Sequence, residues 1–334
     1  MSQAIESSEY LTDGYRALVS GAASWVANGL GLIEVAGADS HAFVNRVVTA
    51  DLSILPPGHF VHSLILRDDA SILDRVTVYR FPERVMLLVD AAQRTAAWDH
   101  ILERKRGNVR LRDISDDMGV IAVRGPATVA RMTSWLTPIP MEPGDLTTAR
   151  FGDIDVFAAR ATADTAEGID FYCRSRDRAT LVATLDRAGV VPVNDEAWRL
   201  HRLEWGIANV GVEIDPGDTP VEAGLEELVA ERKGAPFPGE TALAARRTAG
   251  AMKRLVGLHV AGVSVPPISS RVRVAGVMVD RVRSIGYSPR AGIIGMTALP
   301  TTAATPGTAL MVLSGDRTWQ ATVVNRPFVR RTVG

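Results

Sequence analysis

Residues 62–92, HSLILRDDASILDRVTVYRFPERVMLLVDAA, decide the fold class. Apolar and polar residues alternate around the middle of residues 72–81, and residues 63–66 and 85–89 are short, mainly apolar runs, so that all three are predicted to be strands. Pro82-Glu83-Arg84 predicts a short turn between the second and third runs, which makes those strands antiparallel neighbours. The stretch therefore indicates a strand meander rather than a parallel sheet.

The middle of the second strand carries two opposite charges, Asp74 and Arg75. Because successive side chains in a strand point to opposite faces, Arg75 shares a face with Thr77, and Asp74 shares the other face with Val76. The acid and the base are therefore expected in different surroundings, and both are candidate functional residues.

The sequence on either side of this meander mixes strands with amphipathic helices, whereas from Met252 short strands and turns predominate. The first pattern predicts α+β lobes, and the second predicts an antiparallel β-barrel. We expect residues 1–50 plus 115–248 and residues 51–114 to form two interleaved α+β lobes. Residues 249–334 are expected to form the C-terminal barrel.

Composition excludes several classes of protein. The 334 residues are 46% hydrophobic with a net charge of −1, which is unlike a strongly basic nucleic-acid-binding protein. The single cysteine, Cys173, cannot form an internal disulfide, and no apolar window reaches the length of a membrane span. The first residues contain acids and no signal-peptide core. We expect a cytoplasmic protein that binds neither nucleic acid nor membrane.

The sequence has no motif for catalysis by a metal ion or by a nucleophilic side chain of its own. The six histidines are scattered, and although His59 and His62 are close, no cysteine or nearby carboxylate completes a metal site, so we expect no metal. The chain also lacks a phosphate-binding loop and a nucleophile elbow. A bound cosubstrate is therefore expected to supply the chemistry.

Several stretches, in order, resemble the glycine-cleavage T-protein family of folate-dependent aminomethyltransferases. The resemblance spans nearly the whole chain, and its specificity comes from the number and order of the motifs. The stretches are GLIEVAGADSHAFVNRVVTADLSILPPG (31–58), ASILDRVTVYR (70–80), LLVDAAQRTAAWDHI (87–101), VIAVRGPAT (120–128), AEGIDFY (166–172), RLEWGIANVGVEIDPGDTPVEAGLEELV (202–229), KGAPFPGETAL (233–243), VRSIGYSPRAGIIGMTALP (282–300), TPGTALMV (305–312) and NRPF (325–328).

This resemblance implies a three-lobed cloverleaf around a central hole, with two α+β lobes and a C-terminal antiparallel barrel. It also implies a tetrahydrofolate-dependent transferase or demethylase that moves a methyl or aminomethyl group. Tetrahydrofolate would be the cosubstrate in the hole.

The family's pterin-binding acid matches Asp170, which is a glutamate in the family. A reduced pterin presents two parallel donors that one carboxylate can accept. Glu167 is close enough in sequence to take this role instead. The alternative is that Asp170 lies on the wet face of a strand.

The acid that faces the migrating carbon in the family falls on Arg75, while the acid before it is retained as Asp74. The family's asparagine in the next strand falls on Asp90. We predict an Arg75–Asp90 ion pair across neighbouring strands, or else an Arg75 that covers a lobe interface with its aliphatic stem. Because a guanidinium stabilises an anion and cannot act as a base, a carboxylate-bearing substrate or an anionic leaving group would suit Arg75.

The family's folate-contacting arginine aligns with Trp198, one place before Arg199. Arg199 is therefore displaced by about 100° around a helix, and Arg202 is the alternative contact. Trp198 either stacks on an aromatic ligand or belongs to the core. Glu222 is a retained family acid that either fixes its loop or contacts the ligand.

Two other functions remain open at this point. One is a family-fold enzyme that no longer uses folate and acts on another small molecule. The other is a non-catalytic folate-binding assembly or regulatory factor, although Ala235 stands where that branch of the family has a cysteine. A small-molecule substrate is the expected partner, and a carrier protein is left open.

Overall fold

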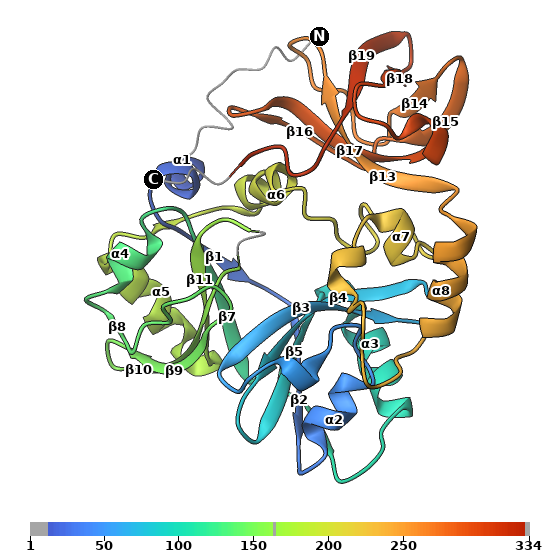
Figure 1. The fold of residues 1–334 in the computed structure, drawn as a ribbon. Helices are drawn as coiled ribbons and strands as arrows, with labels where there is room; N and C mark the ends of the chain where they lie inside the picture. Colours follow the sequence, from blue (N-terminus) through green and yellow to red (C-terminus); the bar gives the residue numbers. More distant parts are fainter. Residues whose placement is uncertain (1–12, 163–164, 331–334) are drawn as a thin grey trace. The chain divides into compact units, whose positions relative to one another are not determined.

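A computed structural model of the chain describes residues 13–162 and 165–330 and divides it into two compact units (Figure 1). Unit 1 contains the described parts of Met1–Tyr15, Asn194–Leu225 and Ala244–Gly334. Unit 2 contains those of Arg16–Val193 and Glu226–Leu243. Residues 1–12, which bear most of the expectation about a signal peptide, lie outside the described part.

Unit 2 contains two sheets, here called sheet I and sheet II. Sheet I has the order β12 (Val191–Pro192), β1 (Ala23–Ala27), β7 (Met118–Arg124), β11 (Gly168–Arg174), β10 (Ile154–Arg160), β9 (Leu146–Phe151), β8 (Leu136–Thr137). Sheet II has the order β3 (His59–Leu66), β4 (Ile72–Arg80), β5 (Arg84–Val89), β2 (Gly31–Ala36), β6 (Arg110–Asp113). The helices that lie wholly in unit 2 are α2 (Ser40–Asn45), α3 (Arg94–Glu103), α4 (Thr128–Met132) and α5 (Arg178–Arg187).

The predicted meander is confirmed. Strands β3, β4 and β5 are antiparallel neighbours, with Thr77 of β4 opposite His62 on one side and Leu88 on the other. The first strand begins at His59, four residues earlier than its apolar run suggests. The two later strands end within a residue or so of their predicted limits.

The two faces of sheet II pack against different layers. Helices α2 and α3 contribute Phe43, Val44 and Ile101 to a core that also contains Val76 and Val78 of β4 (Figure 1). Thr77, between these valines, points to the opposite face of the sheet, because side chains alternate along a strand. On that second face, residues of sheet II join a cluster with residues of sheet I. That cluster includes Phe60, Tyr79, Met86, Val120 and Tyr172.

Unit 1 contains sheet III and the helices α6 (Asp195–Glu204) and α7 (Pro220–Ala223). Two further helices, α1 (Asp13–Ser20) and α8 (Glu240–Ala249), have residues in both units. Sheet III has the order β15 (Val277–Arg281), β14 (Arg271–Val274), β18 (Ala309–Ser314), β19 (Arg317–Val324), β13 (Lys253–Val260), β17 (Gly292–Pro300), β16 (Ser284–Ser288), and its strand pairs are antiparallel.

Sheet III curls so that β15, at one end of the strand order, meets β17 near the other end. Asp280 of β15 accepts a hydrogen bond from the backbone N–H of Ala298 at 2.8 Å, and Thr297 donates to the Arg281 carbonyl at 2.8 Å. This closure confirms the predicted antiparallel C-terminal barrel and, with sheets I and II, the α+β class. The predicted domain limits at residues 50, 114 and 248 stay a proposal.

Candidate functional site

The facing sides of sheets I and II carry the polar residues of greatest interest in unit 2. Arg75 and Tyr79 lie four residues apart in β4 and therefore share a face, as do Asp170 and Tyr172 in β11. The hydroxyl groups of Tyr79 and Tyr172 form a hydrogen bond between the two sheets. The strands that bear Arg75 and Asp170 thus meet at this tyrosine pair.

Both tyrosines are about 1% exposed, and burial raises the pKa of each well above its usual value. The negative charge of Asp170 raises the pKa of both further. Both phenols therefore stay neutral near pH 7, so one hydroxyl donates the hydrogen bond and the other accepts it. This buried hydrogen bond joins β4 to β11.

Asp170 is held by Arg124 in a two-pronged ion pair. The guanidinium Nη1 lies 2.6 Å from Oδ1 of Asp170, and Nη2 lies 3.0 Å from Oδ2. Burial by itself would lower the pKa of Arg124, but the Asp170 carboxylate outweighs it and raises that pKa. The side chains are 13% and 18% exposed, so the pair is reachable from solvent.

Glu167, the alternative pterin acid, is also paired with an arginine. Nη2 of Arg160 lies 2.7 Å from Oε1 of Glu167. The Nε and Nη1 atoms of Arg160 are buried and have no hydrogen-bond partner among the described residues. A ligand that binds either candidate acid would therefore also lie near a guanidinium group.

Asp74 lies on the opposite face of β4, which packs against the helices, and is 1% exposed. Its Oδ2 atom accepts a hydrogen bond from the backbone N–H of Asp90 at 2.8 Å. Burial raises the pKa of Asp74 to about 7, and the charge of Asp90 contributes to the rise. Asp74 thus binds the backbone at Asp90, on the face of β4 opposite to that of Arg75.

Asp90 follows β5 directly. Continuing the register of Thr77 opposite Leu88 places Asp90 across from Arg75. The Oδ1 atom of Asp90 accepts a hydrogen bond from the backbone N–H of Ala92 at 2.9 Å and caps the short helix η2 (Ala91–Gln93). The Arg75–Asp90 ion pair stays a prediction, supported by this register.

Trp198 and Arg199 lie on α6 in unit 1. The Asn194 side chain caps this helix by accepting from the N–H of Ala197 at 2.9 Å. The ring of Trp198 lies 5.8 Å from that of His201, centroid to centroid, and is partly buried. Arg199 is exposed and lines a cavity of about 480 Å³ between α6 and β16. Of the candidates in unit 1, Arg199 is the one whose guanidinium is open to a ligand.

Arg202 and Glu222 are both bonded to groups of the protein. Arg202 binds Glu213 with two hydrogen bonds, of 2.8 and 3.0 Å, and also donates to the Ile207 carbonyl. Glu222 accepts from the backbone N–H of Thr219 at 3.0 Å, which completes a capping box at the start of α7. These contacts give both residues a role in fixing unit 1.

Sequence reasoning missed the polar residues that surround Arg75 and Asp170. They are Tyr79, Tyr172 and His62, and the His62 ring lies 3.0 Å from the Thr77 hydroxyl and 3.1 Å from the Thr162 hydroxyl. The available signal was strand parity, since Tyr172 follows Asp170 by two places and Tyr79 follows Arg75 by four. What parity does not reveal is that the two strands face one another.

Within residues 13–162 and 165–330, no group of three or more His, Cys, Asp or Glu side chains is placed to hold a metal ion. The same part of the chain has no helix that is long and apolar enough to cross a membrane.

Family models cover most of the chain. The model described as the GCVT N-terminal domain matches residues 5–233. The chain belongs to the glycine-cleavage T-protein family. The model of the glycine cleavage T-protein C-terminal barrel domain matches residues 253–330, in agreement with the curled sheet III. The resemblance inferred from short motifs is confirmed.

Curated relatives are identical to this chain at more than a quarter of the aligned positions. The aminomethyltransferase of Bacillus velezensis is 28% identical over 317 residues, which cover 90% of this chain and 85% of the relative. That of Synechococcus elongatus is 29% identical over 315 residues, with 90% and 83% covered.

A solved structure of the same family shares the fold. The crystal structure of the glycine cleavage system aminomethyltransferase T from Bartonella henselae matches with a TM-score of 0.87 at 22% identity. The match covers 95% of this chain and 89% of that one. At this identity the likeness establishes the fold, which is that of a T-protein.

Proposed function

We propose that this protein is a tetrahydrofolate-dependent one-carbon transferase, or the corresponding demethylase, that moves a methyl or aminomethyl group and has an altered substrate range. The observation that carries the proposal is the position of Asp170, a partly exposed carboxylate on the inter-sheet face of unit 2. Membership of the T-protein family and the curated relatives named aminomethyltransferase support it.

The acceptor capacity of Asp170 fits a reduced pterin. A carboxylate offers about four acceptor sites, and the two hydrogen bonds from Arg124 use one on each oxygen. One site therefore remains on each oxygen for the paired donors of a pterin. When bound, tetrahydrofolate would supply the nitrogen that accepts or releases the one-carbon group, and Asp170 would orient the ring.

Arg75 is the basis for the altered substrate range. Its guanidinium shares the inter-sheet face with Thr77 and Tyr79, and at neutral pH it donates hydrogen bonds without accepting a proton. It is therefore suited to hold a substrate carboxylate or to stabilise an anionic leaving group. Asp90, opposite Arg75 in register, would hold that guanidinium in place or manage a proton. A carrier protein is left open as a further partner.

A second candidate is an enzyme of the same fold that no longer uses folate. The pairing of Asp170 with Arg124 and of Glu167 with Arg160 favours it, because each candidate pterin acid already has a strong partner. An enzyme of this kind would present guanidinium groups, rather than carboxylates, to its ligand.

Titration of the full chain with tetrahydrofolate, followed by calorimetry, tests the proposal. We expect saturable binding that Asp170→Ala weakens by about 1.5–3 kcal/mol, the usual loss for a hydrogen bond to a charged group. Asp155→Ala is the matched control, since Asp155 lies on neighbouring β10 with its side chain 83% exposed. If the wild-type protein does not bind at millimolar tetrahydrofolate, the folate proposal fails and the second candidate takes its place.

A further inference from the structure

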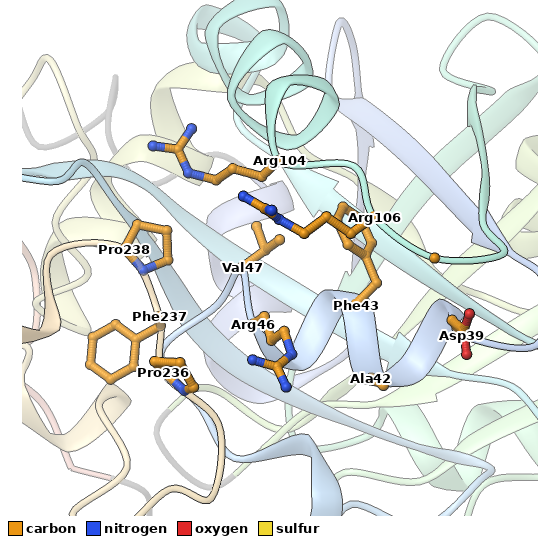
Figure 2. A pocket seen from close by; sticks show the side chains of 11 residues that line it. Asp39, Ala42, Phe43, Arg46, Val47, Arg104, Arg106, Pro236, Phe237 and Pro238 are labelled. Carbon is orange, nitrogen blue, oxygen red and sulfur yellow. The ribbon is translucent and has the colours of Figure 1, made fainter.

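A pocket of about 600 Å³ lies in unit 2 beside α2 (Figure 2). Three segments form its walls: α2 with the residues that follow it, the loop from α3 to β6, and residues 236–238. We call it the arginine pocket, because Arg46, Arg104 and Arg106 line it. In Figure 2 the side chains of Arg104 and Arg106 extend toward the side of Pro238, while the guanidinium group of Arg46 lies apart from them, level with Pro236.

The base of the arginine pocket is apolar and firmly packed. Phe43 is 5% exposed and Val47 is 2% exposed, and both belong to the core between the helices and sheet II. Phe237 is 9% exposed and contributes an aromatic ring from the third wall. The apolar body of a ligand could therefore lie against this base without disturbing the fold.

The positive charges of the pocket are only partly neutralised by the protein. Arg104 pairs with Asp68 at 3.0 Å and with Glu103 at 3.6 Å, but these acids are 82% and 74% exposed and the pairs are screened by solvent. Neither Arg46 nor Arg106 has a side-chain hydrogen bond or ion pair with another residue in the described part of the chain. Two arginines that line the same pocket thus have no counter-charge in the described part of the chain, in a protein whose net charge is −1.

Asp39, the one acid that lines the pocket, is committed elsewhere. Its Oδ2 atom accepts a hydrogen bond from the backbone N–H of Asn108 at 2.7 Å and ties the α3–β6 loop to the start of α2. Gly107, at φ +77°, allows this approach, since a Cβ there would lie 2.7 Å from the same oxygen. The loop that presents Arg104 and Arg106 is therefore held in place by this acid.

We propose that the arginine pocket binds a small molecule that carries a doubly charged oxyanion on an apolar or aromatic body. A phosphate monoester and a pair of adjacent carboxylates both suit a pocket lined by several guanidinium groups, which bind such anions through paired hydrogen bonds. The aromatic or aliphatic part of the ligand would contact Phe237 and the neighbouring prolines.

This site is separate from the one proposed for one-carbon transfer. The arginine pocket lies on the helix-covered side of sheet II, where Phe43 and Val47 pack. Arg75 and Tyr79 project from the opposite face of the same sheet. Occupation of the arginine pocket therefore does not depend on the function of the inter-sheet site.

Calorimetric titration of the full chain at low ionic strength with phenyl phosphate, phthalate and neutral benzamide tests the proposal. We expect at least one of the two anions to bind and benzamide not to bind. The double change Arg46→Gln and Arg106→Gln should weaken the binding of the anion about tenfold or more, as should Ala42→Glu, which places a negative charge on the exposed wall of the pocket.

The controls are Arg174→Gln and Ala130→Glu, single changes of the same kinds at exposed positions of β11 and α4, and each single change Arg46→Gln and Arg106→Gln is compared with the first of them. The two controls should leave binding unchanged. Binding of phenyl phosphate alone would identify a phosphorylated ligand, and binding of phthalate alone would identify a dicarboxylate. The proposal is overturned if neither anion binds the wild-type protein, if benzamide binds equally well, or if the pocket variants bind like the controls.

Discussion

Two arginine–carboxylate pairs in this protein have the same geometry and different surroundings. In unit 2, Arg124 holds Asp170, whose side chain is 18% exposed, and Asp170 has no other hydrogen-bond partner in the described part of the chain. In unit 1, Arg202 holds Glu213, which is fully buried and also accepts from the backbone N–H of Asn209 at 2.9 Å. A carboxylate that the protein saturates serves the fold, whereas one with free acceptor sites near solvent can serve a ligand.

The largest effect is expected from Arg202→Ala. This change leaves the Glu213 carboxylate buried without its cation, which should cost about 3–5 kcal/mol of unfolding free energy. Urea denaturation measures the loss. Arg199→Ala, on the exposed side of the same helix, should stay within about 0.5 kcal/mol of the wild type. Equal losses in the two variants would remove the distinction between a saturated pair and an open side chain.

Asp74 sharpens the comparison, because burial raises the pKa of its carboxyl to about 7, although the backbone N–H groups of Asp90 and Arg75 partly oppose the rise. A pKa that is higher in the folded state means that the folded protein binds the proton more tightly. Stability should therefore fall as the pH rises from about 4 to about 7, by at most about 1.4 kcal/mol per pH unit.

Asp74→Asn should abolish that part of the pH dependence. Relative to the wild type, the variant should therefore be more stable at pH 8 than at pH 4. The measurement is the difference in unfolding free energy between wild type and variant across this range. A difference that does not change with pH would show that Asp74 is ionised throughout.

A smaller effect on stability than that of Arg202→Ala is expected from Arg124→Gln, which removes the guanidinium that holds Asp170. Asp170 can be hydrated when its arginine is lost, so we expect a cost of only about 1 kcal/mol. The same change frees both carboxylate oxygens, and tetrahydrofolate should therefore bind more tightly. If binding weakens instead, Arg124 itself contacts the ligand, and the pair is part of the binding surface.

Strand periodicity predicted the parts of the site that depend on local structure. It placed Arg75 and Asp74 on opposite faces of one strand, and the antiparallel meander brought Asp90 across from Arg75. It could not predict Arg202 as the partner of Glu213, because a helix-surface charge pairs with whichever loop folds over it. The capping role of Glu222, by contrast, is visible in the local pattern from Thr219 to Glu222. The motif resemblance found the family, since the order of many weak signals is itself specific.

The sequence by itself determined the α+β class, the antiparallel meander, the barrel and the family, because these follow from repeating patterns and motif order along the chain. Only the tertiary structure decided that Asp170 meets Arg124, 46 residues away, and that Tyr79 meets Tyr172, 93 residues away. It also decided that Arg46 and Arg106 line the same pocket. The physical reason is that a charged or hydroxyl side chain is paired by its neighbours in space, which the packing of sheets and loops selects.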